Sequence, residues 1–300
     1  MSGYDAGTPS FSSVDISGTI STGFHYTGGV LLPSGKVVFV PYTAANVGIF
    51  DPATDTFSLV GPTISDDYKY SGGVLLPSGK VVFVPHNAAK VGVFDPATDA
   101  FSLVGPTLSG SWKYSGGVLL PSGKVVFVPF NTANVGVFDP ATDEFSFVGP
   151  TIYGGNKYSG GVLLPSGKVV FVPYYAGRVG IFDPATDTFS LVGPTIVDGY
   201  KYSGGVLLPS GKVVFVPFNA NNVGILDPAT DKFSLVGPTL SGDAKYSGGV
   251  LLPSGKVVFV PYLADNVGVF DPGNAEPAYT VEGGVPDAWR ALLSPHFNKF

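Results

Sequence analysis

Five lysines recur at one position of the chain, with a spacing of 44 residues, and each is followed by tyrosine. A histidine takes the sixth place of this series, whose members are Lys69, Lys113, Lys157, Lys201, Lys245 and His25. If these side chains point toward a common axis, they would bind a small anion such as phosphate, sulfate or a carboxylate, because clustered like charges require a counterion. In the alternative arrangement, each lysine pairs with an acid or a carbonyl group of a neighbouring unit, and Tyr70 and its copies pack between units.

Aromatic and amide side chains concentrate in two segments that differ between the copies of the unit. The first segment reads YTAAN, HNAAK, FNTAN, YYAGR, FNANN and YLADN, and the second reads STGF, SDDY, SGSW, YGGN, VDGY and SGDA. Aromatic surface combined with adaptable hydrogen-bonding groups is typical of binding surfaces and suits stacking against carbohydrate. The residues expected to bind a ligand are Phe24, Tyr42, Tyr68, His86, Trp112, Asn131, Tyr153, Asn156, Tyr175, Arg178, Tyr200, Asn219 and Asn221. Alternatively, these segments differ only because longer loops tolerate change better than tight turns.

Recognisable catalytic and metal-binding patterns are missing from the sequence. The three histidines, His25, His86 and His296, fall in different contexts and lack metal-ligand spacing. Common hydrolase, zinc-protease, phosphate-loop and dinucleotide motifs are also missing. The repeated DPATD string indicates a turn in which Asp caps the backbone, rather than a calcium site, which needs a denser acidic loop. We therefore expect no metal, no cofactor and no enzymatic activity, with an acid pair such as Asp66 and Asp67 as the remaining catalytic candidate.

An internal repeat defines the elements that must position these residues. The string GGVLLPSGKVVFVP occurs six times, beginning at Gly28 and then every 44 residues without insertion or deletion. Each unit contains four apolar runs separated by Gly, Pro or Asp, as in residues 71–76, 81–84, 91–95 and 101–104. These runs predict four short antiparallel strands, A to D. Six units predict an all-β, six-bladed β-propeller, because strands at a period of about 40–50 residues are typical of propeller blades.

The strand pattern also predicts where the variable segments lie. Runs A and B are apolar at consecutive positions, which indicates blades that pack face to face in a ring. The pair Gly72 and Gly73 opens strand A, and we interpret it as a bulge or a close backbone approach near the crowded axis. Because strands alternate in direction, the A–B and C–D turns lie at one end of each blade, and the B–C and D–A segments at the other. The variable segments are therefore expected on one face, with the lysine series at the mouth of the channel.

A glycine pair followed by an apolar hairpin, in a four-stranded unit of this length, resembles the kelch-type β-propellers over about residues 11–271. The spaced tyrosine and tryptophan of a full kelch motif are not all present. The resemblance implies a propeller fold and a binding role, with no particular ligand. The near-identity of the units is typical of a recently amplified or an engineered, symmetric propeller.

The blades are expected at about residues 24–64, 68–108, 112–152, 156–196, 200–240 and 244–272, with residues 11–20 completing the last blade. Residues 11–21 align with the strand D segment FSLVGPTIS with two extra residues, which predicts an N-terminal outer strand that closes the ring. The segment 278–281 (AYTV) is an alternative candidate for the outer strand of the sixth blade. Residues 273–300 are expected to form an extension with a short helix, which caps an exposed edge or binds a partner as a peptide.

Composition narrows the classes of partner, location and function that this protein can have. Of the 16 basic residues, 11 belong to repeated positions, and no basic stripe predicts a nucleic-acid partner. No apolar stretch predicts a membrane span, the N-terminus lacks a signal-peptide pattern, and there is no cysteine, so we expect a soluble monomer without a membrane partner. The predicted function is a non-enzymatic scaffold, lectin-like or anion-binding, that takes a glycan, a small anion or a protein on the variable segments. The alternatives are a propeller with no evolved ligand, and a hydrolase or lyase with its site at the channel mouth.

Overall fold

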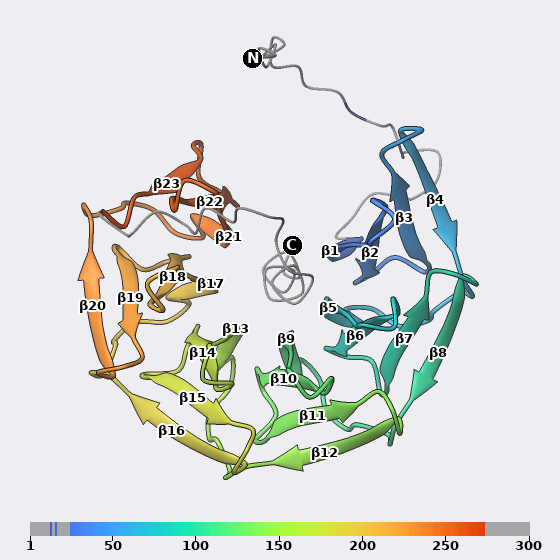
Figure 1. The fold of residues 1–300 in the computed structure, drawn as a ribbon, viewed down its shortest axis with the longest axis horizontal. Helices are drawn as coiled ribbons and strands as arrows, with labels where there is room; N and C mark the ends of the chain where they lie inside the picture. The colour runs from blue at the N-terminus through green and yellow to red at the C-terminus, as the bar shows by residue number, and fades with distance from the viewer. Residues whose placement is uncertain (1–12, 14–15, 17–24, 274–300) are drawn as a thin grey trace, which may run out of the picture.

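The protein folds as six antiparallel sheets arranged around a central axis (Figure 1). The computed structural model describes residues 13, 16 and 25–273. Within this part of the chain, five sheets have four strands and the last sheet has three. The strands of every sheet are hydrogen-bonded in sequence order, so each unit is one blade that runs from strand A near the axis to its outer strand at the rim. The predicted all-β, six-bladed propeller is confirmed.

The strand bounds repeat from blade to blade with the period of the sequence. The first two blades contain β1 (Tyr26–Leu31), β2 (Val37–Pro41), β3 (Val47–Asp51), β4 (Thr56–Val60), β5 (Tyr70–Leu75), β6 (Val81–Pro85), β7 (Val91–Asp95) and β8 (Ala100–Val104). The next two contain β9 (Tyr114–Leu119), β10 (Val125–Pro129), β11 (Val135–Asp139), β12 (Glu144–Val148), β13 (Tyr158–Leu163), β14 (Val169–Pro173), β15 (Val179–Asp183) and β16 (Thr188–Val192). The last two contain β17 (Tyr202–Leu207), β18 (Val213–Pro217), β19 (Val223–Asp227), β20 (Lys232–Val236), β21 (Tyr246–Leu251), β22 (Val257–Pro261) and β23 (Gly268–Phe270).

The inner strands are apolar at consecutive positions because neighbouring blades cover both of their faces. Every residue of β10 is buried, whereas the rim strand β12 is mostly exposed. The core clusters mix residues of adjacent blades, such as Val30 and Val40 of the first blade with Tyr70 and Phe83 of the second. Apolar burial therefore stabilises the seams between blades, and a single blade could not bury its own faces.

Two constant turns join the strands at one end of each blade. In the A–B turn of the second blade, Gly79 adopts a φ of +84°, a conformation that glycine tolerates best. In the C–D turn, the Asp95 carboxylate accepts a hydrogen bond from the Ala97 amide at 3.0 Å, and Asp99 has a φ of +54°. This is the Asp-capped turn predicted for DPATD.

The glycine pair at the start of strand A forms a bulge beside the axis, as predicted. The register of β5 on β6 shifts between Tyr70 and Gly73, and Gly72 has a φ of +93°. A Cβ atom on Gly73 would lie 2.9 Å from side-chain carbons of both Val30 and Val40 in the preceding blade. Any larger residue at this position would push the two blades apart, so the close seam requires glycine.

Several expectations lie outside the described residues. These are the rival strand at residues 278–281, the helix of the C-terminal extension, the position of Phe24, and most of the closing strand expected at residues 11–20. Ser13, within that segment, is exposed and belongs to no strand. In the described part of the chain, no helix combines the length and the hydropathy that a membrane span needs.

Candidate functional site

The B–C and D–A segments come together at one end of the blades, opposite the constant turns. Backbone hydrogen bonds join them within and between blades: the Asn87 amide donates to the Tyr68 carbonyl at 2.9 Å, and the Lys113 amide donates to the His86 carbonyl at 2.9 Å. Equivalent bonds recur around the ring. We call this end of the molecule the variable face. The prediction that sequence differences gather on one face is confirmed.

The lysine series lies beneath the variable face. The side chains are buried, with 1–4% exposure, at Lys69, Lys113, Lys157, Lys201 and Lys245. Each ammonium group donates to the main-chain carbonyl three residues earlier, as Lys113 Nζ does to Gly110 at 2.8 Å. Lys113 and Lys157 also reach a carbonyl of the preceding blade, at 3.1 and 2.8 Å. The bonds of Lys113 and Lys157 to the preceding blade match the alternative in which each lysine pairs with a carbonyl group of a neighbouring unit. The ammonium groups of Lys69, Lys201 and Lys245 donate within their own D–A segments. Anion binding by the series stays a prediction.

Charge compensation divides these lysines into two groups. Burial lowers the pKa of all five, and nearby loop carboxylates oppose this effect at Lys69, Lys201 and Lys245. The D–A segments before Lys113 and Lys157 read SGSW and YGGN and contain no acid. There, burial lowers the pKa to about 8. Two neighbouring blades therefore hold buried amines that lose their proton just above neutral pH.

Several polar residues that were expected to bind a ligand form hydrogen bonds with main-chain groups of the loops. The Asn131 Oδ1 atom accepts a hydrogen bond from the Asn156 amide at 2.7 Å, and Asn219 makes the equivalent bond in the fifth blade. The Arg178 guanidinium donates to the Gly193 carbonyl at 2.6 and 3.0 Å. These contacts give the three side chains a structural role, and their contact with a ligand remains a prediction.

Six ring-bearing side chains form a continuous arc, which we call the aromatic arc. They occupy the first position after strand B in each blade: Tyr42, His86, Phe130, Tyr174, Phe218 and Tyr262. Consecutive ring centroids lie 5.5–5.9 Å apart. Because the blades diverge outward, such short spacing between blades places the rings near the axis, at the mouth of the channel. Sequence analysis included the first two members and missed the other four, although their 44-residue spacing was visible.

An outer row of aromatic residues packs on the aromatic arc from the D–A segments. Its members are Tyr68, Trp112 and Tyr200. Their ring centroids lie 5.0–5.4 Å from an arc residue, and the side chains are 39–43% exposed. All three have φ values near +54°, which costs a bulky residue on the order of 1–3 kcal/mol and is concentrated at functional sites. The fold thus holds three exposed rings in strained positions around the channel mouth.

The two remaining tyrosines of the expected site differ in their placement. Tyr175 extends the outer row, because its ring centroid lies 5.3 Å from that of Tyr200. Its ring also explains the glycine at position 199, where a Cβ atom would lie only 2.4 Å away. Tyr153 stands apart, with 87% of its side chain exposed.

Burial keeps the phenols of Tyr42 and Tyr174 neutral. It raises the pKa of Tyr42, with smaller contributions from Tyr68 and Tyr262, and it raises the pKa of Tyr174 to about 12. The buried His86 places Nδ1 2.9 Å from the Tyr114 carbonyl. Because a carbonyl oxygen only accepts, Nδ1 carries a proton and donates. The channel mouth offers flat apolar faces together with neutral hydrogen-bond donors.

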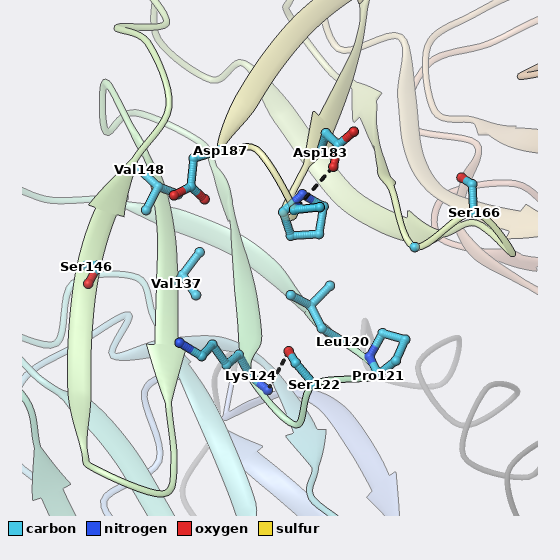
Figure 2. Close-up of a pocket in the computed structure, with 13 residues that line it drawn as sticks. Leu120, Pro121, Ser122, Lys124, Val137, Ser146, Val148, Ser166, Asp183 and Asp187 are labelled. Carbon is cyan, nitrogen blue, oxygen red and sulfur yellow. Dashed lines mark hydrogen bonds between the residues drawn. The ribbon is translucent and has the colours of Figure 1, made fainter.

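A separate groove of about 470 Å³ lies at the opposite end of the molecule, between the third and fourth blades (Figure 2). Constant-turn residues such as Lys124, Asp183 and Asp187 line it. Two of its charged groups have partners, since Lys124 pairs with Asp139 at 3.2 Å and Asp183 accepts a hydrogen bond from the Ala185 amide at 3.0 Å. The groove was not expected from the sequence.

Comparisons with known proteins identify the fold of this chain, but they do not assign it to a family. No protein-family model and no curated protein matches the chain. Among solved structures, virginiamycin B lyase from Staphylococcus aureus has a TM-score of 0.71 at 14% identity, covering 84% of this chain and 82% of its own. A catalytically inactive histidine-to-alanine variant of that enzyme with quinupristin has a TM-score of 0.69 at 13% identity, covering 84% and 83%. A streptogramin B lyase has a TM-score of 0.64 at 15% identity, covering 78% and 75%.

The expectation that this protein is not an enzyme is corrected by these likenesses. It relied on the absence of familiar catalytic motifs from the sequence. Enzymes of the lyase class nevertheless share the architecture of this chain. At such low identity the likeness establishes the β-propeller fold alone, and kelch membership is not supported by any family match.

Proposed function

We propose that the variable face binds a small ligand at the channel mouth, through the aromatic arc and the outer row. The single observation that supports this best is the unbroken contact of aromatic rings from blade to blade, with centroids 5.5–5.9 Å apart. His86 and Phe130 of the arc are buried, and the exposed rings of the outer row pack on the arc. Scattered exposed aromatic residues need no explanation, but exposed rings gathered at one place mark a binding site. A lectin-like role on a kelch-like propeller is the more specific form of this proposal.

The chemistry of the mouth favours a neutral, ring-containing ligand such as a glycan. Flat aromatic faces stack on the C–H faces of sugars, and the neutral phenols of Tyr42 and Tyr174 supply hydrogen-bond donors. The buried lysines already donate to carbonyl groups, so an anion would have to displace those bonds. We therefore propose anion binding by the lysines as the less favoured mode, after stacking of a sugar on the aromatic rings.

Fluorescence of Trp112 offers a direct test, because the chain has only two tryptophans. Replacing the other one by Trp289→Phe leaves Trp112 as the reporter, and a glycan array followed by titration gives Kd. Trp112→Ala should weaken binding by about tenfold or more, since a stacked aromatic is often a dominant contact. The exposed Tyr153 is the matched control, and Tyr153→Ala should leave Kd unchanged. Equal effects of both substitutions, or no binding to any glycan, would refute the proposal.

A lyase or hydrolase reaction at the same mouth is the second candidate function. The observation that favours it is His86, whose Nδ1 donates to the Tyr114 carbonyl, so that the ring has a fixed orientation. An oriented imidazole can act as a general acid or base, and the Tyr42 phenol, 5.8 Å away between ring centroids, can donate a hydrogen bond to a developing oxyanion. In the similar lyase, a histidine-to-alanine variant is catalytically inactive.

Quinupristin is a suitable probe for this second function, since it is bound in the similar structure. Consumption of the compound can be followed by liquid chromatography. Turnover that is lost in His86→Gln and kept in Tyr153→Phe would support a role for His86. Turnover that survives His86→Gln would place the reaction elsewhere.

A further inference from the structure

Two of the D–A segments share a pattern that the other segments lack. They read SDDY at residues 65–68 and VDGY at residues 197–200, with aspartate at the second position and tyrosine at the fourth. Three periods of 44 residues separate them, which is half of a six-bladed ring. The strands that follow them, β5 and β17, lie on opposite sides of the axis (Figure 1). The second and the fifth blade therefore carry the same pair of side chains on opposite sides of the channel mouth.

The aromatic contacts of the two copies are the same. The Tyr68 ring packs edge-on against Tyr42 of the preceding blade, with centroids 5.0 Å apart and an interplanar angle of 65°. The Tyr200 ring packs in the same way against Tyr174, at 5.1 Å and 69°. Tyr42 and Tyr174 are half-buried, whereas 39% of Tyr68 and 41% of Tyr200 is exposed. Each copy thus offers one exposed ring that a half-buried ring holds in place.

The aspartate of each copy adopts a backbone conformation that glycine tolerates better. Asp66 and Asp198 have φ values of +76° and +77°, and glycine occupies the equivalent place in the third, fourth and sixth blades. The turn itself therefore does not require aspartate, and strain of this kind is concentrated at functional sites. The main-chain carbonyls of Asp66 and Asp198 accept hydrogen bonds from the buried lysines Lys69 and Lys201, at 2.7 and 2.8 Å. These bonds anchor the main chain of each exposed aspartate two residues before the exposed ring.

Other side chains fit the place of the exposed tyrosine. Trp112, Asn156 and Ala244 occupy it in the third, fourth and sixth blades, with φ values of +55°, +51° and +49°. Tyr68 and Tyr200 have nearly the same φ of +54°. The loop backbone thus does not dictate the side chain, and the fold does not explain why aspartate and tyrosine occur together in two opposite blades.

We propose that the channel mouth contains two equivalent sugar subsites on opposite sides of the axis, so that one protein binds two ligand molecules. The first subsite consists of Tyr42, Asp66 and Tyr68, and the second consists of Tyr174, Asp198 and Tyr200. The two subsites rest on the proposed function of the variable face, and they specify its ligand and its stoichiometry. A sugar ring stacks its C–H face on the exposed phenol ring, and two adjacent hydroxyl groups donate to the carboxylate, which only accepts.

A third ring distinguishes the two subsites. The centroid of Trp112 lies 6.5 Å from that of Tyr68, whereas the centroid of Tyr175 lies 5.3 Å from that of Tyr200. The two subsites should therefore bind the same class of ligand with different affinities.

Equilibrium dialysis against radiolabelled methyl glycosides of glucose, galactose and mannose counts the bound molecules directly. At saturation, the protein should bind two molecules of at least one glycoside. Tyr68→Asn and Tyr200→Asn should each leave one bound molecule, and the double variant should leave none. Asparagine keeps the loop backbone, because Asn156 has the same conformation at the equivalent place. Tyr153→Ala, outside both subsites, is the matched control and should leave two bound molecules.

Glycine substitutions test the contact between the carboxylates and the hydroxyl groups. In the Tyr200→Asn background only the first subsite remains, and Asp66→Gly should weaken its Kd by about tenfold or more, since hydrogen bonds to charged groups are the stronger ones. In the Tyr68→Asn background, Asp198→Gly should have the same effect. Gly110 and Gly154 show that the loop accepts glycine at this place. An unchanged Kd in both variants would overturn the proposal.

The outcomes separate the two subsites from the proposed function. One bound molecule in the unchanged protein, or complete loss of binding in either single tyrosine variant, overturns the pair of subsites and leaves glycan binding at the mouth intact. No binding of any glycoside overturns both. Choline is the second probe, because aromatic rings beside a carboxylate also attract a cation. Binding of choline that is tighter than that of every glycoside overturns the assignment to sugars.

Discussion

Buried amines on two neighbouring blades should make the protein more stable as the pH rises from 8 to 10. Burial lowers the pKa of Lys113 and of Lys157 from 10.5 to about 8. Below pH 8 both the folded and the unfolded chain carry these charges, and folding bears the full cost of burying them, about 3 kcal/mol per lysine. Between pH 8 and 10.5 the unfolded chain binds the additional protons, so the free energy of unfolding must increase with pH.

The expected increase is about 2 kcal/mol per lysine between pH 8 and pH 10. The remaining lysines of the series have lowered pKa values and act in the same direction. Buried tyrosines act in the opposite direction from about pH 9 upward, because their raised pKa values let the unfolded phenols ionise first, and each one costs about 0.4 kcal/mol at pH 10. The free energy of unfolding therefore reports mainly on the lysines between pH 8 and 9, and up to pH 10 the contribution of each lysine is the difference between its variant and the unchanged protein.

Urea denaturation followed by circular dichroism at several pH values measures this effect. Lys113→Met and Lys157→Met should each remove about 2 kcal/mol of the increase. Lys124 is the control, because its side chain is 48% exposed and pairs with Asp139, so Lys124→Met should leave the pH dependence unchanged. A free energy of unfolding that is flat or falls between pH 8 and 9, or the same pH dependence in all three variants, would refute the reasoning.

Three further substitutions test the packing of the blades. Gly136→Ala should destabilise the protein by about 1–3 kcal/mol, because the new methyl group would lie 2.5 Å from the Phe145 ring, and thermal melting measures the loss. Asn131→Ala removes the hydrogen bond to the Asn156 amide and should cost about 1 kcal/mol in urea denaturation, with greater proteolysis of residues 153–156. Lys124→Met breaks an exposed ion pair and should change the free energy of unfolding at pH 7 by less than about 1 kcal/mol.

Much of the fold could be predicted because the repeat encodes it locally. Continuous apolar runs, the turn strings PSGK and DPATD, and the glycine pair each predicted the element that the structure contains, as at β5, β6 and Gly73. The alternation of strand direction also placed the variable segments on one face. These features depend on neighbours in the sequence, or on contacts that every blade repeats.

The candidate site was harder to predict because it depends on contacts between blades. Sequence reasoning favoured residues that vary and so included Tyr42 and His86, yet it omitted Phe130, a less polar member of the same ring. It also left open the direction of the lysines, which the loop carbonyl groups decide. Asn131 was expected to contact a ligand, although its amide holds the neighbouring loop.

The sequence by itself determined the number of blades, their strands and the face on which differences gather. This follows because a period of 44 residues without insertion forces every unit into the same sheet. Only the tertiary structure decided which rings meet at the axis and where the buried ammonium groups point. Those properties depend on how neighbouring blades approach each other, and local sequence patterns do not specify that geometry.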